Sequence, residues 1–246
     1  MTTTSVVGAE PTWGEATAIG ARRLAAVTAA GGLLGLLVGG VGGRLAMLLL
    51  AQLNPEVAGM QSDDDFTIGQ LTTATFNLLF VATLIGVVGG GIYFVLRGLM
   101  IGPRWFQILS ISVGPAVVVG NSLVHTDGVD FTMLDPALLA VAMFVLIPGI
   151  YAALLTVLAE RWLEEDGFFA TAPTRVAVLP LLLWAPIAPG LILLAAGLAA
   201  YEAVRRTARG AAVLSLQVWP NLARAGLAVI FAIALAALIQ DTATVA

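Results

Sequence analysis

The sequence predicts an all-α protein, a polytopic transmembrane helical bundle with six spans or with five spans and a re-entrant segment. Hydrophobic residues make up 59% of the chain and charged residues 11%, whereas an ordinary soluble domain has about 25% charged residues. Several apolar stretches reach the roughly 20 residues that a helix needs to cross the hydrocarbon core. Hydrocarbon offers the backbone no hydrogen-bond partners, so such stretches must be helical.

The expected elements follow one another with short connections. We expect residues 1–20 to form a flexible polar tail and residues 21–246 to form a single transmembrane domain. The apolar stretches predict spans at 24–53, 67–96, 105–124 and 137–160, a fifth segment at 176–200, and a last span that ends near residue 240.

The fifth segment has two readings. It contains Pro180, Pro186 and Pro189, and each proline removes a backbone donor and tends to kink a helix. The segment can cross the membrane fully, or it can dip in and return as a hairpin, which leaves five spans. A third option places the arginines that follow it, Arg205, Arg206 and Arg209, on an interfacial amphipathic helix.

Arginine positions predict the orientation of the first four spans. Their arginine-bearing ends fall on one side, and the opposite loops hold no arginine; the residues are Arg22, Arg23, Arg97, Arg104, Arg161 and Arg175. By the positive-inside rule this side is cytoplasmic, together with the N-terminus. A complete fifth crossing would place Arg205, Arg206 and Arg209 outside, against the same rule.

Composition also excludes several chemistries. The chain has no cysteine, and all 11 basic residues are arginine. Disulfides, thiolate metal sites and Schiff-base chemistry on lysine are therefore excluded. No basic patch suggests nucleic acid. The arginine-only, Ala/Gly-rich bias is typical of a GC-rich bacterial genome, so we expect a multi-pass protein of the bacterial plasma membrane, in contact with the lipid bilayer.

The first span is dense in glycine, with Gly31, Gly32, Gly35, Gly39, Gly40, Gly42 and Gly43. Their spacing includes the small-xxx-small pattern that lets helix backbones approach closely. Helix packing within the chain is the simplest meaning. A membrane-protein partner or a second copy of the chain could use the same face.

Arg44 is the first candidate site residue. It lies about 30 Å along the helix from Leu24, so it is interfacial if the span starts at Leu24 and buried if the span starts nearer Gly31. Buried arginines are costly and usually paired. We expect a structural ion pair or a substrate contact, formed with acidic residues of the outer loops: Asp63, Asp64, Asp65 and Asp135.

The loop with His125, Asp127 and Asp130 is the second candidate. Imidazole and carboxylates are ligands that suit zinc or manganese, so one reading is a divalent metal site. The spacing matches no strong metal motif, and a solvated acidic loop or a proton- or substrate-handling site are the other readings. GxSxG, HExxH and Gly-rich phosphate loops are absent from the sequence.

Three function classes remain open from the sequence. The leading hypothesis is a small carrier, or a channel-like or other membrane subunit, with a polar site at the outer ends of spans one to four. The alternatives are a metal-dependent membrane enzyme acting at the outer leaflet and a ligand-free scaffold or accessory subunit. Whether the chain is an enzyme is thus undecided at this level.

Overall fold

The computed structural model describes residues 12–57, 59–60, 70, 72–124 and 134–245. Within these residues it contains helices and no strand. Six helical stretches are long and apolar enough to cross a membrane: Trp13–Leu53, Thr73–Leu99, Arg104–Leu123, Ala137–Trp162, Thr174–Arg205 and Val218–Thr244. The predicted class, a polytopic helical membrane protein, is confirmed.

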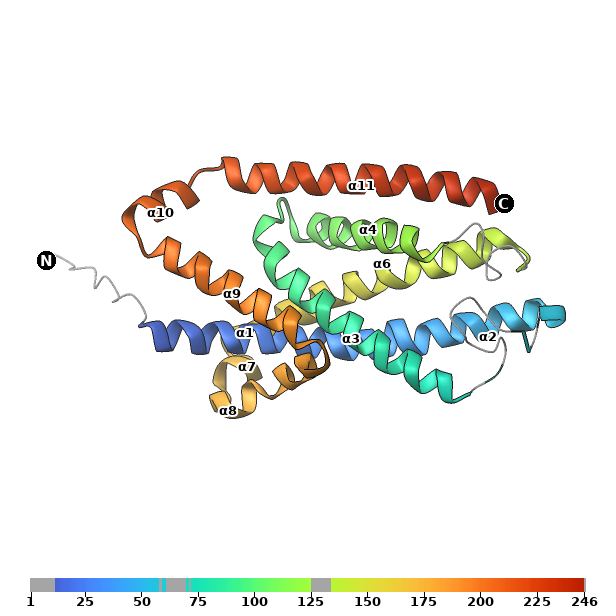
Figure 1. Cartoon of the computed structure of the whole chain (residues 1–246), viewed down its shortest axis with the longest axis horizontal. Coiled ribbons are helices and arrows are strands. Elements are labelled where there is room, and N and C mark those ends of the chain that lie inside the picture. Colours follow the sequence, from blue (N-terminus) through green and yellow to red (C-terminus); the bar gives the residue numbers. More distant parts are fainter. Residues whose placement is uncertain (1–11, 58, 61–69, 71, 125–133, 246) are drawn as a thin grey trace, which may run out of the picture.

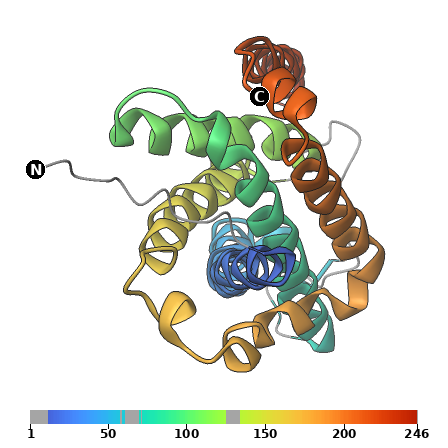
Figure 2. The ribbon, with the colours of Figure 1, turned by 90° about the vertical axis from the view of Figure 1, so that its left-hand side faces the viewer.

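The first stretch is a continuous rod at the centre of the bundle. It consists of α1 (Trp13–Leu34), the π-helical turns η1 (Gly35–Gly42) and α2 (Gly43–Leu53). Figure 2 shows the other elements arranged around it. In its apolar window 61% of the residues are buried, against 11% to 28% in the other five stretches. The central rod is therefore the main packing surface of the protein.

The rod begins earlier than the sequence suggested. Thr12 caps α1, because its Oγ1 accepts from the amide of Glu15 at 3.3 Å while its own amide donates to the Glu15 carboxylate at 2.9 Å. This reciprocal pair is a capping box. Residues 13–20 are thus helical and do not belong to the expected polar tail, whereas residues 1–11 lie outside the described part.

Glycines bring α1 into backbone contact with the antiparallel helix α3 (Thr73–Leu96). A Cβ atom added to Gly31 would lie 2.3 Å from the Gly86 carbonyl oxygen, and one added to Gly90 would lie 2.3 Å from that of Val27. At Gly35 the corresponding distance to the Ala82 carbonyl is 2.4 Å. We call Gly31, Gly35, Gly86 and Gly90 the glycine seam. Because α3 covers the glycines of the first span, a membrane-protein partner or a second copy of the chain would have to bind another surface.

Two further crossing helices, α4 (Arg104–Leu123) and α6 (Ala137–Trp162), pack against each other. The Ser112 hydroxyl donates to the Gly149 carbonyl at 2.9 Å across this pair. The Tyr151 hydroxyl of α6 donates to the Gly86 carbonyl at 2.6 Å. This bond ties the α4–α6 pair to the glycine seam.

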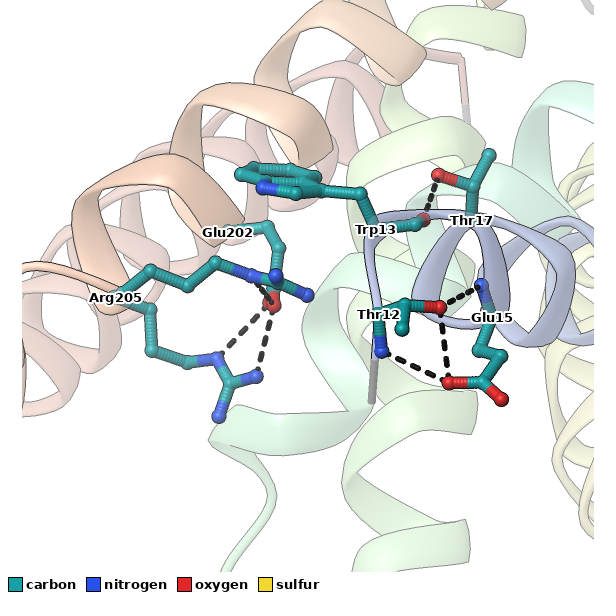
Figure 3. A network of polar contacts seen from close by, with 7 residues as sticks. Thr12, Trp13, Glu15, Thr17, Glu202 and Arg205 are labelled. Atoms are coloured by element: carbon teal, nitrogen blue, oxygen red, sulfur yellow. Dashed lines mark hydrogen bonds and ion pairs between the residues drawn. The ribbon is translucent and has the colours of Figure 1, made fainter. Parts of the chain in front are cut away.

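The proline-rich segment starts and ends beside the first turns of α1. After α7 (Phe168–Thr171) come α8 (Thr174–Ala177), the 3₁₀ turns η4 (Leu179–Ile187) and α9 (Ala188–Arg205). At its start, Arg22 donates to the Thr174 hydroxyl at 2.7 Å. Beyond its end, the Arg206 guanidinium lies 4.1 Å from the ring centre of Trp13, near the Glu202–Arg205 pair shown in Figure 3.

The middle of this segment reaches deeper into the bundle. The indole Nε1 of Trp184 in η4 donates to the buried Thr28 hydroxyl of α1 at 2.9 Å. The chain therefore enters along α1, bends at η4 and returns, as Figure 1 shows. Although its length and composition would allow a crossing, this route is the re-entrant alternative of the sequence analysis.

The last helix, α11 (Val218–Val245), follows α10 (Ala208–Leu214) and runs along one side of the bundle, beside α4. Near its start, Arg224 Nε donates to the Leu99 carbonyl, just after α3, at 2.8 Å. Near its other end, Leu238 packs in one cluster with Leu50 and Ala140. The two ends of the described chain consequently lie at opposite ends of the bundle.

The two ends of the bundle differ in charge. At one end lie the first residues of α1, α4 and α11 and the last residues of α3 and α6. Both termini of the re-entrant segment lie at the same end. We call it the arginine end, because every arginine except Arg44 lies there. The other end, with Asn54, Leu123 and Ala137, is called the loop end.

The glycine seam makes a direct prediction. Gly86→Ala places a methyl group against the backbone of Gly31 and Gly35, so the helices must separate. We expect a loss of about 1 to 3 kcal/mol in the free energy of unfolding, typical of overpacking, measured by denaturant or thermal unfolding in mild detergent. Gly226→Ala in α11, where no atom lies within 4 Å of the added Cβ, is the matched control. Equal stability of the two variants would contradict the seam.

The re-entrant route is tested by labelling, since the chain has no cysteine. Single cysteines at Thr171 and Ser215 should react with a membrane-impermeant maleimide from the same side, and a cysteine at Thr244 from the opposite side. All three positions are exposed. A complete fifth crossing would instead group Thr171 with Thr244 and leave Ser215 alone.

Candidate functional site

Arg44 is buried in the loop-end half of the bundle. It is the second residue of α2, and it is only 4% exposed. Its Nη2 donates to the backbone carbonyl of Gln70, and its Nη1 lies 3.6 Å from the Met47 sulfur. Gln70 lies just before α3, within the range 67–96 that the sequence predicted for the second span.

The glycine seam fixes the depth of Arg44. Because α1 and α3 run antiparallel with Gly31 opposite Gly86 and Gly35 opposite Ala82, Arg44 lies level with the first turn of α3. From there α2 continues to Leu53, about 14 Å further. Along this extension Leu45 and Leu53 are 60% and 50% exposed, so lipid-facing apolar side chains continue past Arg44. Arg44 is thus buried among protein side chains at the level where α3 begins.

The π-helical turns position this side chain. Between Gly35 and Gly42 the helix is wound more loosely than an α-helix, and glycine dominates the segment. An added Cβ at Gly40 would lie 2.8 Å from the Leu79 side chain, so small residues are needed for α3 to pack here. π-helical turns rotate the residues that follow them and occur frequently at functional sites. Here they set the direction in which Arg44 leaves the rod.

Asn54 closes the loop end. It is 1% exposed, its Nδ2 donates to the Leu50 carbonyl at 2.9 Å, and its Oδ1 accepts from the Asp135 amide at 2.8 Å. Val124 and Leu134 are buried in one cluster with Leu50. The described flanks of the loop 125–133 are therefore fixed on α2.

The structure places two of the predicted site residues. Arg44 lies inside the bundle, and Asp135 is exposed just before α6. About 15 Å separates Arg44 along α2 from Asn54, which binds the Asp135 backbone. These two residues are therefore not brought together. The remaining predicted residues, Asp63, Asp64, Asp65, His125, Asp127 and Asp130, lie outside the described residues. Within the part that is described, no three His, Asp or Glu side chains form a group that could hold a metal.

A polar cluster that the sequence reasoning missed lies at the arginine end. Arg97 binds the Glu160 carboxylate with Nε at 3.1 Å and Nη2 at 2.9 Å. The Tyr93 hydroxyl donates to the same carboxylate at 2.7 Å. Tyr93 and Arg97 are one helical turn apart, and Glu160 is the single acidic residue of α6. These two features of the sequence could have indicated a contact between the two helix ends. The cluster joins α3 to α6, and bidentate geometry makes it a strong clamp.

No family model, no curated protein and no solved structure matches this chain. The arrangement of its own residues is thus the basis for any assignment of function. Two features distinguish the loop end: a guanidinium that is buried inside the bundle, and an amide side chain that binds the Asp135 backbone just before α6.

The Asn54 bonds predict a stability effect. Asn54→Ala leaves the Asp135 amide without its acceptor, and unmet buried hydrogen bonds cost about 1 to 3 kcal/mol. We expect the free energy of unfolding in detergent to fall by this amount. Asn221→Ala, which removes an exposed amide in α11, should change it by less than about 0.5 kcal/mol. An unchanged value for the Asn54 variant would show that the bond to the Asp135 amide does not stabilise the fold.

Proposed function

We propose that this integral membrane protein is a small carrier, without enzymatic activity, that binds an anionic solute at its loop end through Arg44. The observation that supports this most is the guanidinium of Arg44, 4% exposed and level with the first turn of α3. A charged side chain buried inside a membrane protein is costly, and it commonly marks a substrate or ion pathway.

Irregular helix geometry supports the same proposal. The π-helical turns of η1 precede Arg44 directly, and the 3₁₀ turns of η4 approach α1 at Thr28 and Gly32 from the opposite end. Carriers often build their sites from interrupted helices, because unwound backbone and changed side-chain directions create room for a solute. The predicted involvement of Asp63, Asp64, Asp65 and Asp135 in substrate binding stays a prediction.

The charge distribution supports an orientation. With the re-entrant route, all arginines except Arg44 gather at one end of the bundle, and the positive-inside rule assigns this end to the cytoplasm. The N-terminus is then cytoplasmic, and the loop end with Arg44 faces the exterior. A bacterial plasma membrane is the setting that we propose on composition.

The test is ligand-dependent stability of the detergent-purified protein. We expect at least one anion from a panel of chloride, nitrate, sulfate, phosphate, acetate and succinate to raise the melting temperature. A ligand at 100 times its Kd stabilises by about 2.7 kcal/mol. The same anion should then exchange across proteoliposomes that contain the protein, measured as uptake of the labelled ion.

Arg44→Gln is the decisive variant. It keeps a hydrogen-bond donor for the Gln70 carbonyl but removes the charge, so the anion-dependent shift should disappear. Arg209→Gln, at an exposed position of α10, should keep the shift. Equal anion stabilisation of Arg44→Gln and the unmodified protein, or no stabilisation by any anion of the panel, would refute the proposal.

A further inference from the structure

An apolar groove of about 640 Å³ lies between α3 and the re-entrant segment. Its lining includes Val88, Ile92 and Val95 of α3 on one side, and Trp184, Pro186 and Leu194 of the hairpin on the other. Ile92 and Val95 are 54% and 53% exposed, so the groove is open on the lipid-facing side. Ligand sites typically have volumes of about 300 to 1,000 Å³.

The floor of the groove is rigid. Trp184 is 3% exposed and is held by its hydrogen bond to the buried Thr28. The indole ring fits only because Gly91 has no side chain: a Cβ added there would lie 2.9 Å from Cη2 of the indole. Glycine at this position of α3 thus lets the indole of Trp184 pack directly against the helix.

The groove runs along α3 toward the arginine end. Its lining residues on α3 extend from Val88 to Leu96, about 12 Å along the helix axis. This is the direction of a lipid acyl chain in the bilayer. Just beyond Leu96, the guanidinium of Arg224 lies against the Leu99 carbonyl, with Nε at 2.8 Å.

Arg224 carries a charge next to Leu99, three residues beyond the last groove-lining residue of α3. Its Nε binds the Leu99 carbonyl and its Nη1 the Asn221 side chain at 3.1 Å. Among the described residues, no acceptor lies within hydrogen-bond distance of its Nη2 and no carboxylate forms an ion pair with it. The guanidinium is therefore positioned to donate to an anionic group at the headgroup level.

We propose that this groove binds one anionic phospholipid of the arginine-end leaflet, with an acyl chain between α3 and Trp184 and the phosphate at Arg224. The apolar lining fits the chain, and the basic residue at the end of the groove fits the negative headgroup. The bound lipid fills the space between the re-entrant hairpin and the bundle, and it stabilises the hairpin in its bent form. This site is separate from Arg44, at the opposite end of the bundle.

The experiment is native mass spectrometry of the full-length protein in mild detergent, with phosphatidylglycerol and phosphatidylcholine of identical acyl chains added in equal amounts. We expect the protein to retain phosphatidylglycerol about fivefold more strongly, the effect of one arginine beside an anionic headgroup. Equal retention of the two lipids by the unmodified protein would overturn the proposal without any variant.

Two variant pairs locate the site. Arg224→Gln should remove the preference for phosphatidylglycerol, and Arg209→Gln should keep it. Ile92→Trp fills the groove and should lower retention of both lipids, whereas Ile85→Trp, on the same helix and 63% exposed outside the groove, should not. If Arg224→Gln keeps the preference, or if Ile92→Trp binds lipid as well as Ile85→Trp, the groove is not the binding site. Size-exclusion chromatography checks folding, and the Arg224 pair decides alone if Ile92→Trp aggregates.

Discussion

Backbone contact between α1 and α3 is the constraint on which the rest of this structure depends. At Gly31, Gly35, Gly86 and Gly90 the two helices approach so closely that even a methyl group would collide with a carbonyl oxygen. In lipid there is little hydrophobic gain from joining two apolar helices, so close packing and hydrogen bonds must stabilise the pair. The Tyr151 hydroxyl adds such a bond by donating to Gly86 within the seam. The central position of α1 follows from this packing.

The seam also sets the positions of both polar regions. Its antiparallel register places Arg44 level with the first turn of α3, while α2 continues beyond this level to Asn54, which binds the Asp135 backbone just before α6. At the other end the same register brings Tyr93 and Arg97 to Glu160. The re-entrant hairpin then packs on the remaining side, with Trp184 held on Thr28 of α1. The buried guanidinium and the apolar groove thus depend on one helix pair but lie toward opposite ends of the bundle.

Much of the fold could be predicted from the sequence, because hydrocarbon leaves a long apolar stretch only the helical conformation. The ends of spans were less predictable: α1 starts at Trp13 because of its Thr12–Glu15 cap, and α3 starts at Thr73, where the Thr72 amide donates to the Thr75 hydroxyl. The route of the proline-rich segment could not be decided from hydropathy, since both routes use the same residues. Arginine positions carried that information, as Arg205, Arg206 and Arg209 obey the positive-inside rule only if the chain turns back.

The site was less predictable than the fold. Arg44 was visible as a charge in an apolar stretch, but its depth depends on which residues of α3 it meets. The cluster of Tyr93, Arg97 and Glu160 forms because two helices lie side by side. Sequence spacing indicates which residues share a face of one helix, but it does not indicate which other helix packs against that face. Likewise, the glycines of the first span predicted close packing, while their partner, the Gly86–Gly90 pair of α3, is known only from the three-dimensional arrangement.

The most direct test of the central claim is an engineered cross-link across the α1–α3 contact in this cysteine-free chain. An added Cβ at Gly39 would lie 3.4 Å from the Cβ of Ala82, close to the spacing of about 3.5 to 4.5 Å in a disulfide. The double variant Gly39→Cys/Ala82→Cys, oxidised in the membrane and then treated with maleimide under denaturing conditions, should show an intrachain disulfide and take up no label. Two labels per chain, or dimers formed by Gly39→Cys alone, would contradict the packing of the central rod against α3.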